Sequence, residues 1–151
     1  MPRASADLDL DLERAIPYLL ARTGARMGNA FARALKPHGL SLVEWRVCAS
    51  LNHRPDQTLS QLVVNASMDM SALSRLIDRL IAQGVVARER SAQDARALRL
   101  ALTPEGKALT RRLIPDARRY EATALQGFTQ AEVDQLREML NRIYANASEL
   151  P

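Results

Sequence analysis

The sequence contains few cysteine, histidine and aromatic residues. Its single cysteine, Cys48, excludes an intramolecular disulfide. The chain has only two histidines in addition, so a zinc site would have few Cys and His ligands. Aromatic residues make up 4% of the chain, which argues against a large β-sandwich and suits packed helices rich in Leu and Ala. There is no glycine-rich phosphate loop, no nucleophile elbow and no spacing of Asp, His and Ser typical of a catalytic set. We therefore expect no enzyme, no cofactor and no metal site.

Long apolar runs are missing as well. No stretch reaches the length that crosses a membrane, and the first fifteen residues lack the apolar core of a secretory signal. Apolar residues nonetheless make up 47% of the 151 residues, enough for one folded unit with a core of its own plus additional helices. We expect a cytoplasmic protein without a membrane partner.

The positive charge is concentrated in one part of the chain. The net charge is +4, and residues 71–112 carry nine Lys and Arg against four Asp and Glu, an excess of five. This segment therefore accounts for the whole net charge of the chain. Such a concentration favours a polyanionic partner at this segment.

Hydrophobic periodicity predicts a mainly helical chain. Helices are expected at residues 13–35, 42–51, 59–66, 71–83, 104–128 and 130–147. Ser41, Thr58 and Thr129 each stand three residues before a Glu or Gln, the capping-box pattern, and Thr103-Pro104 opens another helix. Gly84 ends the helix at 71–83, and alternation of Leu98, Leu100 and Leu102 predicts a hairpin strand. A short helix, a turn, a longer helix and a hairpin form a helix-turn-helix followed by a wing.

The predicted helix at 71–83 has two different faces. Leu73, Leu76, Ile77, Leu80 and Ile81 form an apolar stripe, and the other side carries Ser71, Arg75, Asp78, Arg79 and Ala82, flanked by Ala72 and Ser74. Small residues allow close approach to a DNA groove, hydroxyls reach phosphates or bases, and Arg can bind guanine. A solvated helix face with ordinary Arg–Asp pairs is the alternative reading of this pattern.

The hairpin favours the DNA-binding interpretation. Arg88 and Arg90 precede the turn, and Arg96 lies near its tip, where an arginine can enter a narrow minor groove. Asp94 is not attracted to DNA, but it is close enough in sequence to pair with Arg88 or Arg90 and brace the loop. A flexible charged turn is the alternative.

These residues resemble the wing signature of the MarR family of bacterial transcriptional regulators. The signature is an Arg, then D-x-R, then an alternating strand ending in L-T-x-x-G, and this chain has Arg88, Asp94-Ala95-Arg96 and Leu102-Thr103-Pro104-Glu105-Gly106. The stretch LSRLIDRL at residues 73–80 and Gly84-Val85-Val86 also resemble the recognition helix of the family and its exit. The resemblance extends over about residues 13–147.

The resemblance implies a homodimeric winged helix-turn-helix repressor bound to a near-palindromic operator of double-stranded DNA, and often released by a small aromatic or phenolic effector. The winged part is expected at 41–103, and residues 13–35 with 104–147 are expected to form the dimerisation helices. Ser71, Ala72, Ser74, Arg75 and Arg79 would face the major groove, and Arg96 the minor groove, braced by Asp94 and Arg88. Ser60 and Gln61 would reach phosphates from the first helix of the motif.

Other functions remain open at this stage. Cys48 lies in a mostly apolar helix and is interpreted as a core residue, although a redox sensor built on this thiol is an alternative. Five residues are candidates for an effector pocket: Tyr18, His38, Trp45, Arg46 and His53. For each of them a purely structural role is the more common interpretation. A helical interaction module without DNA binding is a further alternative, against which the basic wing argues.

Overall fold

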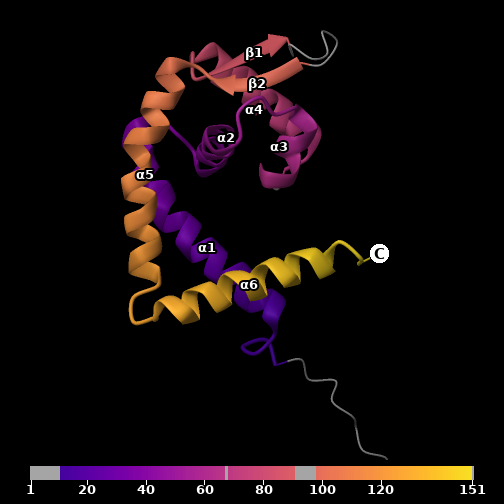
Figure 1. Cartoon of the computed structure of the whole chain (residues 1–151), viewed down its shortest axis with the longest axis vertical. Coiled ribbons are helices and arrows are strands. Elements are labelled where there is room, and N and C mark those ends of the chain that lie inside the picture. Colours follow the sequence, from indigo (N-terminus) through magenta and orange to yellow (C-terminus); the bar gives the residue numbers. More distant parts are fainter. Residues whose placement is uncertain (1–10, 67, 91–97, 151) are drawn as a thin grey trace, which may run out of the picture. The chain divides into compact units, whose positions relative to one another are not determined.

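The computed structural model describes residues 11–66, 68–90 and 98–150, without the side chain of Asn65. Its elements are α1 (Ile16–Leu35), the 3-10 helix η1 (Lys36–His38), α2 (Leu42–His53), α3 (Leu59–Ala66), α4 (Met70–Ala82), β1 (Val86–Arg90), β2 (Leu98–Leu102), α5 (Pro104–Ala124) and α6 (Gln130–Ala147) (Figure 1). The two strands pair antiparallel. The chain divides into two compact units, Met1–Ala117 and Arg118–Pro151. The predicted mainly helical class with a two-stranded wing is confirmed.

The helix starts follow the predicted capping chemistry. Pro17 lies in the first turn of α1, where no N–H is needed, and Pro104 is the first residue of α5. At Ser41 both capping-box bonds are present: the Glu44 N–H donates to Ser41 Oγ, and the Ser41 N–H donates to Glu44 Oε2 at 2.8 Å. Thr58 and Thr129 begin α3 and α6 in the same way. These local bonds fix where each helix starts and therefore how α2, α3 and α6 follow their loops.

The core of the first unit is made of aliphatic side chains from its helices and from the sheet. The fully buried ones include Leu35, Val47, Leu51, Leu62, Leu73, Ile77, Leu80, Val86 and Leu113. Helix α2 contributes Val47, Cys48 and Leu51, which agrees with the predicted central position of that helix. Because α4 buries the predicted Leu and Ile stripe in this core, its opposite face is held toward solvent.

Some boundaries differ from the predicted ones. Helix α1 starts at Ile16 rather than at residue 13, and α2 continues to His53. Helix α5 ends at Ala124 instead of near Phe128, because Gly127 takes a left-handed φ of 90° and the Phe128 N–H donates to the carbonyl of Leu125. Pro115 lies inside this helix.

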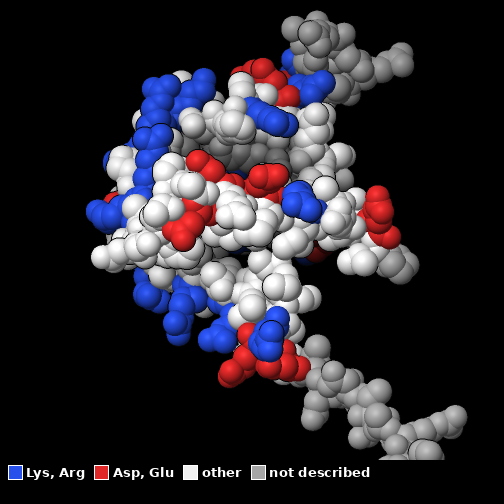
Figure 2. All heavy atoms as spheres, turned by 60° about the horizontal axis from the view of Figure 1, so that its bottom comes forward, with Lys and Arg blue, Asp and Glu red and all other residues white. Residues whose placement is uncertain are grey.

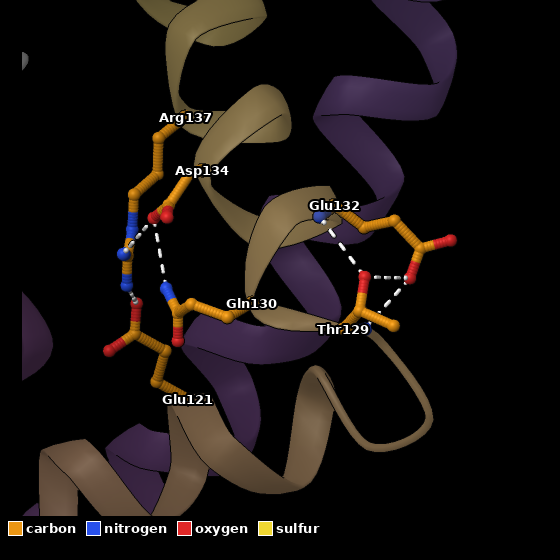
Figure 3. Close-up of polar contacts among 6 residues, drawn as sticks. All are labelled: Glu121, Thr129, Gln130, Glu132, Asp134 and Arg137. Atoms are coloured by element: carbon orange, nitrogen blue, oxygen red, sulfur yellow. Dashed lines mark hydrogen bonds and ion pairs between the residues drawn. The ribbon is translucent and has the colours of Figure 1, made fainter.

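The second unit is a helical hairpin formed by the end of α5 and by α6. Figure 3 shows how polar side chains tie it: Arg137 on α6 lies 3.4 Å from Glu121 on α5 and 3.2 Å from Asp134, which also accepts a hydrogen bond from Gln130. Apolar side chains on α6 stay exposed, among them Met139, Leu140, Ile143 and Tyr144. Within the described part of the chain, no helix is both long and apolar enough to span a membrane.

Candidate nucleic-acid interface

Helix α4 presents the face that the sequence predicted. Leu73, Leu76, Ile77 and Leu80 are buried, and Ile81 is half-buried at the edge of the stripe. Ser71, Arg75, Asp78, Arg79 and Ala82 are exposed, and Ala72 and Ser74 are half-buried between the two sides. Arg75 makes no ion pair with any residue that the structure describes. Its guanidinium is therefore available to an external anion.

Asp69 caps the N-terminus of α4, a role the sequence reading did not assign. Its Oδ1 accepts 2.8 Å hydrogen bonds from the Ala72 N–H and from the Ser71 hydroxyl. These bonds, led by the one from Ala72, lower the pKa of the Asp69 carboxyl, so it stays ionised at neutral pH. The Ser71 hydroxyl donates its proton to this cap, which leaves its oxygen lone pairs to accept from another group.

Helix α3 carries the two residues expected to reach phosphates. Ser60 and Gln61 are both exposed. The side-chain oxygen of Gln61 accepts the Thr58 N–H at 2.8 Å as part of the capping box. Of these two side chains, the amide NH₂ of Gln61 and the Ser60 hydroxyl are the groups that could donate to a phosphate.

The wing is connected to α4 by an ion pair. In the hairpin Arg88 lies opposite Leu100, and Arg90 lies opposite Leu98. Arg88 Nη2 is 2.6 Å from Asp78 Oδ1 on α4. Arg88 was predicted to brace Arg96 together with Asp94, and this contact in addition makes it a link between β1 and the predicted recognition helix. Asp94 and Arg96 lie outside the described residues.

The base of the wing is also anchored to the loop between α2 and α3. The Leu100 N–H donates to the Gln57 carbonyl at 2.8 Å, and Arg99 donates to the Asp56 carbonyl at 3.1 Å. The buried Gln57 amide in turn donates to the carbonyls of Ser50 and Arg54 at the end of α2. Sequence reasoning treated this stretch as a loop and missed Gln57, since a single Gln in a polar loop gives no pattern.

Thr103 and Gly106 close the wing against the exit of α4. The Thr103 hydroxyl donates to the Gly84 carbonyl at 2.6 Å and accepts the Gly106 N–H at 3.0 Å. A Cβ on Gly106 would lie only 2.0 Å from the carbonyl oxygen of Val85. The L-T-x-x-G stretch of this chain is therefore a junction that joins β2, α5 and the end of α4.

Arg79 has a partner on another helix. Its Nη2 lies 3.8 Å from Oε1 of Glu44, whose side chain is only 9% exposed, while that of Arg79 is 64% exposed. The sequence indicated the capping role of Glu44 but gave no sign of this second contact. Helix α4 is thus linked to α2 on one side and to the wing on the other.

Basic side chains also continue beyond α4 and the wing. Exposed Lys107, Arg111 and Arg112 follow on the first turns of α5. In the view of Figure 2, basic side chains gather on the left side of the molecule, the side on which Figure 1 draws α5. The positive excess of residues 71–112 is therefore spread over α4, both strands of the wing and α5 rather than confined to one helix.

The five candidates for an effector pocket do not form one cluster in the chain. Trp45 is half-buried and makes an edge-to-face contact with Phe31 at a centroid distance of 5.5 Å. Tyr18 lies 13 residues before Phe31 on the same helix, about 20 Å away at the rise of an α-helix. His38 is half-buried in η1, whereas Arg46 and His53 are exposed. Of the five, only Trp45 is seen to contact another aromatic ring.

Cys48 is fully buried, as expected for a core residue. Burial raises the pKa of its thiol to about 11, and the nearby charge of Glu44 contributes in the same direction. In the described residues no group of three or more His, Cys, Asp or Glu side chains is arranged to hold a metal ion.

Comparisons with known proteins agree with this geometry. A family model described as the MarR family matches residues 38–97. The chain is 31% identical over 126 residues to an HTH-type transcriptional repressor of Mycobacterium tuberculosis, a match that covers 83% of this chain and 91% of that protein. A MarR family transcriptional regulator from Silicibacter pomeroyi is 34% identical, with a TM-score of 0.80 and coverage of 89% and 91%. The crystal structure of CouR from Rhodococcus jostii bound to p-coumaroyl-CoA has 25% identity, a TM-score of 0.82 and coverage of 89% and 95%.

The fold and the exposed face of α4 thus define a winged helix-turn-helix protein of the DNA-binding type. The chain belongs to the MarR family, and it is a MarR-type helix-turn-helix transcriptional repressor, not an enzyme. Repressors of this family bind operator DNA as dimers. The family assigned from the wing signature is confirmed.

Proposed function

We propose that this chain binds a near-palindromic operator as a homodimer and is released from it by a small aromatic ligand. The exposed face of α4 carries the DNA part of the proposal. Ser71, Ala72 and Ser74 are small enough for the helix to approach base edges closely, and Arg75 is unpaired among the described residues. An arginine in this position can donate two hydrogen bonds to guanine in the major groove.

Contacts around this helix would fix its position on the duplex. The Ser60 hydroxyl and the Gln61 amide NH₂ would donate to phosphates from α3, and Arg90 extends the basic surface along β1. Arg88, held by Asp78, would maintain the angle between α4 and the wing. Arg96 would enter the minor groove with Asp94 as its brace, the part of the proposal that rests on the sequence pattern.

Exposed apolar side chains support the dimer. Leu12, Ile16, Leu20 and Met27 lie on or just before α1, and α6 exposes a second set that includes Ile143 and Tyr144. Apolar side chains at helical spacing are costly to leave in water, and a second copy of the chain would cover them. Residues 13–35 and 104–147 are therefore the proposed dimerisation helices.

The effector part of the proposal rests on a relative and on one aromatic pair. CouR, at 25% identity, is described with bound p-coumaroyl-CoA, an aromatic acyl thioester. In this chain Trp45 packs edge-to-face on Phe31 where α1 meets α2, and half-buried His38 follows α1 directly. An aromatic ligand would bind next to this pair, with Arg46 able to reach an acidic group of the ligand. Tyr18 and His53 would take part only through a rearrangement or through the second copy.

The redox alternative is weaker because of the position of the thiol. With a pKa of about 11, only roughly one Cys48 in ten thousand is a thiolate at neutral pH, and thiolate is the form that peroxides attack. The interaction module without DNA binding is disfavoured because α4 keeps an exposed basic face.

Selection from a pool of random duplexes tests the DNA part. The enriched sites should contain two related half-sites about 10 base pairs apart, centre to centre. Arg75→Ala should lose selectivity at one base position in each half-site, and Arg111→Ala on α5 serves as a control that removes the same charge. A pool that shows no enrichment at low salt would refute the proposal.

Fluorescence of the only tryptophan tests the effector part. Trp45 should report binding when p-coumaroyl-CoA or a free aromatic acid is titrated, and the same ligand should release the selected duplex. Coenzyme A without the aromatic acyl group is the control. Ligands that release the duplex without changing the fluorescence would place the effector away from Trp45.

A further inference from the structure

Glu44 occupies an unusual position for a carboxylate. It is 7% exposed, and it stands in the first turn of α2, where Oε2 accepts the Ser41 N–H at 2.8 Å. Its other oxygen, Oε1, faces Arg79 on α4 at 3.8 Å. A buried carboxylate is costly without compensating partners, so the contact with Arg79 is a part of its stabilisation.

Arg79 lies on the proposed DNA-binding face. It follows Arg75 by four residues, so the two arginines share one stripe of the helix surface. Its side chain is 64% exposed although it touches Glu44. Among the described residues, the long contact with Glu44 is the ion pair of this guanidinium, and most of its side chain is in water.

We propose that Glu44 competes with the DNA backbone for Arg79, so that the carboxylate restrains a phosphate contact that this arginine would otherwise make. The inference rests on the proposed DNA binding and adds to it an internal residue that limits affinity. When DNA binds, a phosphate oxygen replaces Glu44 Oε1 as the partner of the guanidinium. The Ser41 N–H continues to hold the carboxylate.

Arg79 and Arg88 differ in how closely their carboxylate partners hold them. Arg88 lies 2.6 Å from Asp78, a tight contact that suits a structural link between the wing and α4. The 3.8 Å contact of Arg79 is near the limit of an ion pair, and most of the Arg79 side chain lies in water, so this contact shifts an equilibrium only slightly although Glu44 is buried. A phosphate can therefore displace Glu44 from Arg79 far more easily than it can displace Asp78 from Arg88.

The capping box provides a clean test. Glu44→Gln keeps a side-chain acceptor at the third helical position, since Gln serves in capping boxes as well as Glu, but it removes the charge that holds Arg79. The measurement is the dissociation constant for a selected operator duplex at several salt concentrations, for the wild type, Glu44→Gln, Arg79→Ala and the double variant.

We expect Glu44→Gln to bind about two- to fivefold tighter at low salt, the range by which a long ion pair with one exposed partner shifts an equilibrium. The slope of the plot of log K against log salt should stay unchanged, because Arg79 contacts a phosphate in the complexes of both proteins. In the Arg79→Ala background the Gln substitution should change neither quantity. Equal tightening in both backgrounds would mean a general charge effect, and it would overturn the proposal, as would unchanged or weaker binding by Glu44→Gln.

Two further measurements keep the test decisive. Thermal melting of each variant shows whether the fold is retained. If Glu44→Gln does not fold, the NMR signal of the Arg79 guanidinium in the wild type decides: it must shift on addition of DNA, and an unchanged signal overturns the inference. If wild-type protein does not bind the duplex at all, the proposed function fails, which is a different result from a wild type that binds with the same affinity as Glu44→Gln.

Discussion

Gly106 offers a sharp test of how the wing is held. In Gly106→Ala the added Cβ would lie 2.0 Å from the Val85 carbonyl oxygen and 3.3 Å from Leu102 Cδ2. An ordinary carbon–oxygen contact is longer than 3 Å, so backbone must move by about 1 Å. That same oxygen accepts the Thr103 N–H at 3.1 Å, and a shift large enough to admit the methyl group would weaken this bond.

The magnitude follows from these contacts. Overpacking costs about 1–3 kcal/mol, and a weakened hydrogen bond adds about 1 kcal/mol. The better helix propensity of Ala returns at most about 1 kcal/mol, which leaves a net loss of about 1–3 kcal/mol. For a chain of this length the melting temperature should fall by roughly 3–10 °C. Because Val85 and Thr103 begin and end the hairpin, operator binding should weaken as well.

Gly24→Ala is the matched control. It is the same substitution within a helix, but apart from the adjacent backbone of α1 no described atom lies within 4 Å of the added methyl group. It should leave the melting temperature unchanged or raise it slightly through helix propensity. The assay is thermal unfolding followed by circular dichroism, with operator affinity measured in parallel. If Gly106→Ala melts at the wild-type temperature, the junction is not as rigid as the argument requires.

The remaining predictions concern the interface, the dimer and the thiol. Arg75→Ala and Arg96→Ala should each weaken operator binding by about 1–3 kcal/mol at fixed salt, and an unchanged dissociation constant would exclude a base contact by that residue. The protein should sediment as a dimer at micromolar concentration without DNA, and Ile143→Asp on the exposed face of α6 should shift it toward the monomer; a wild-type monomer would contradict the proposal. Cys48→Ser should keep DNA binding and its insensitivity to peroxide, with a stability loss of about 1–3 kcal/mol if the hydroxyl finds no partner; loss of peroxide-driven release in the variant alone would instead identify a redox sensor.

Much of the fold could be predicted because its signals are local. The capping boxes at Ser41, Thr58 and Thr129 are contained within four residues each, and all three are present in the structure. The apolar stripe of α4 depends only on helical periodicity, and four of its five members are buried as expected, with Ile81 half-buried at the edge. The end of α5 was predicted less well, because Gly127 acts through a backbone angle in the turn, and the apolar spacing up to Phe128 does not show it.

The partners of charged residues could not be predicted in the same way. Asp78 has Arg75 three residues before it on its own helix, a spacing that suits a local pair, yet it pairs with Arg88, ten residues away. Which arginine pairs with Asp78 depends on the direction that the chain takes from Gly84 into β1. That direction is set by the packing of the folded chain. Glu44 is fully accounted for in the sequence by its capping box, so nothing there indicates that its second oxygen faces Arg79. The capping box accounts for Oε2 of Glu44 and carries no information about Oε1. In this protein Oε1 faces Arg79 on α4, the helix proposed to bind DNA.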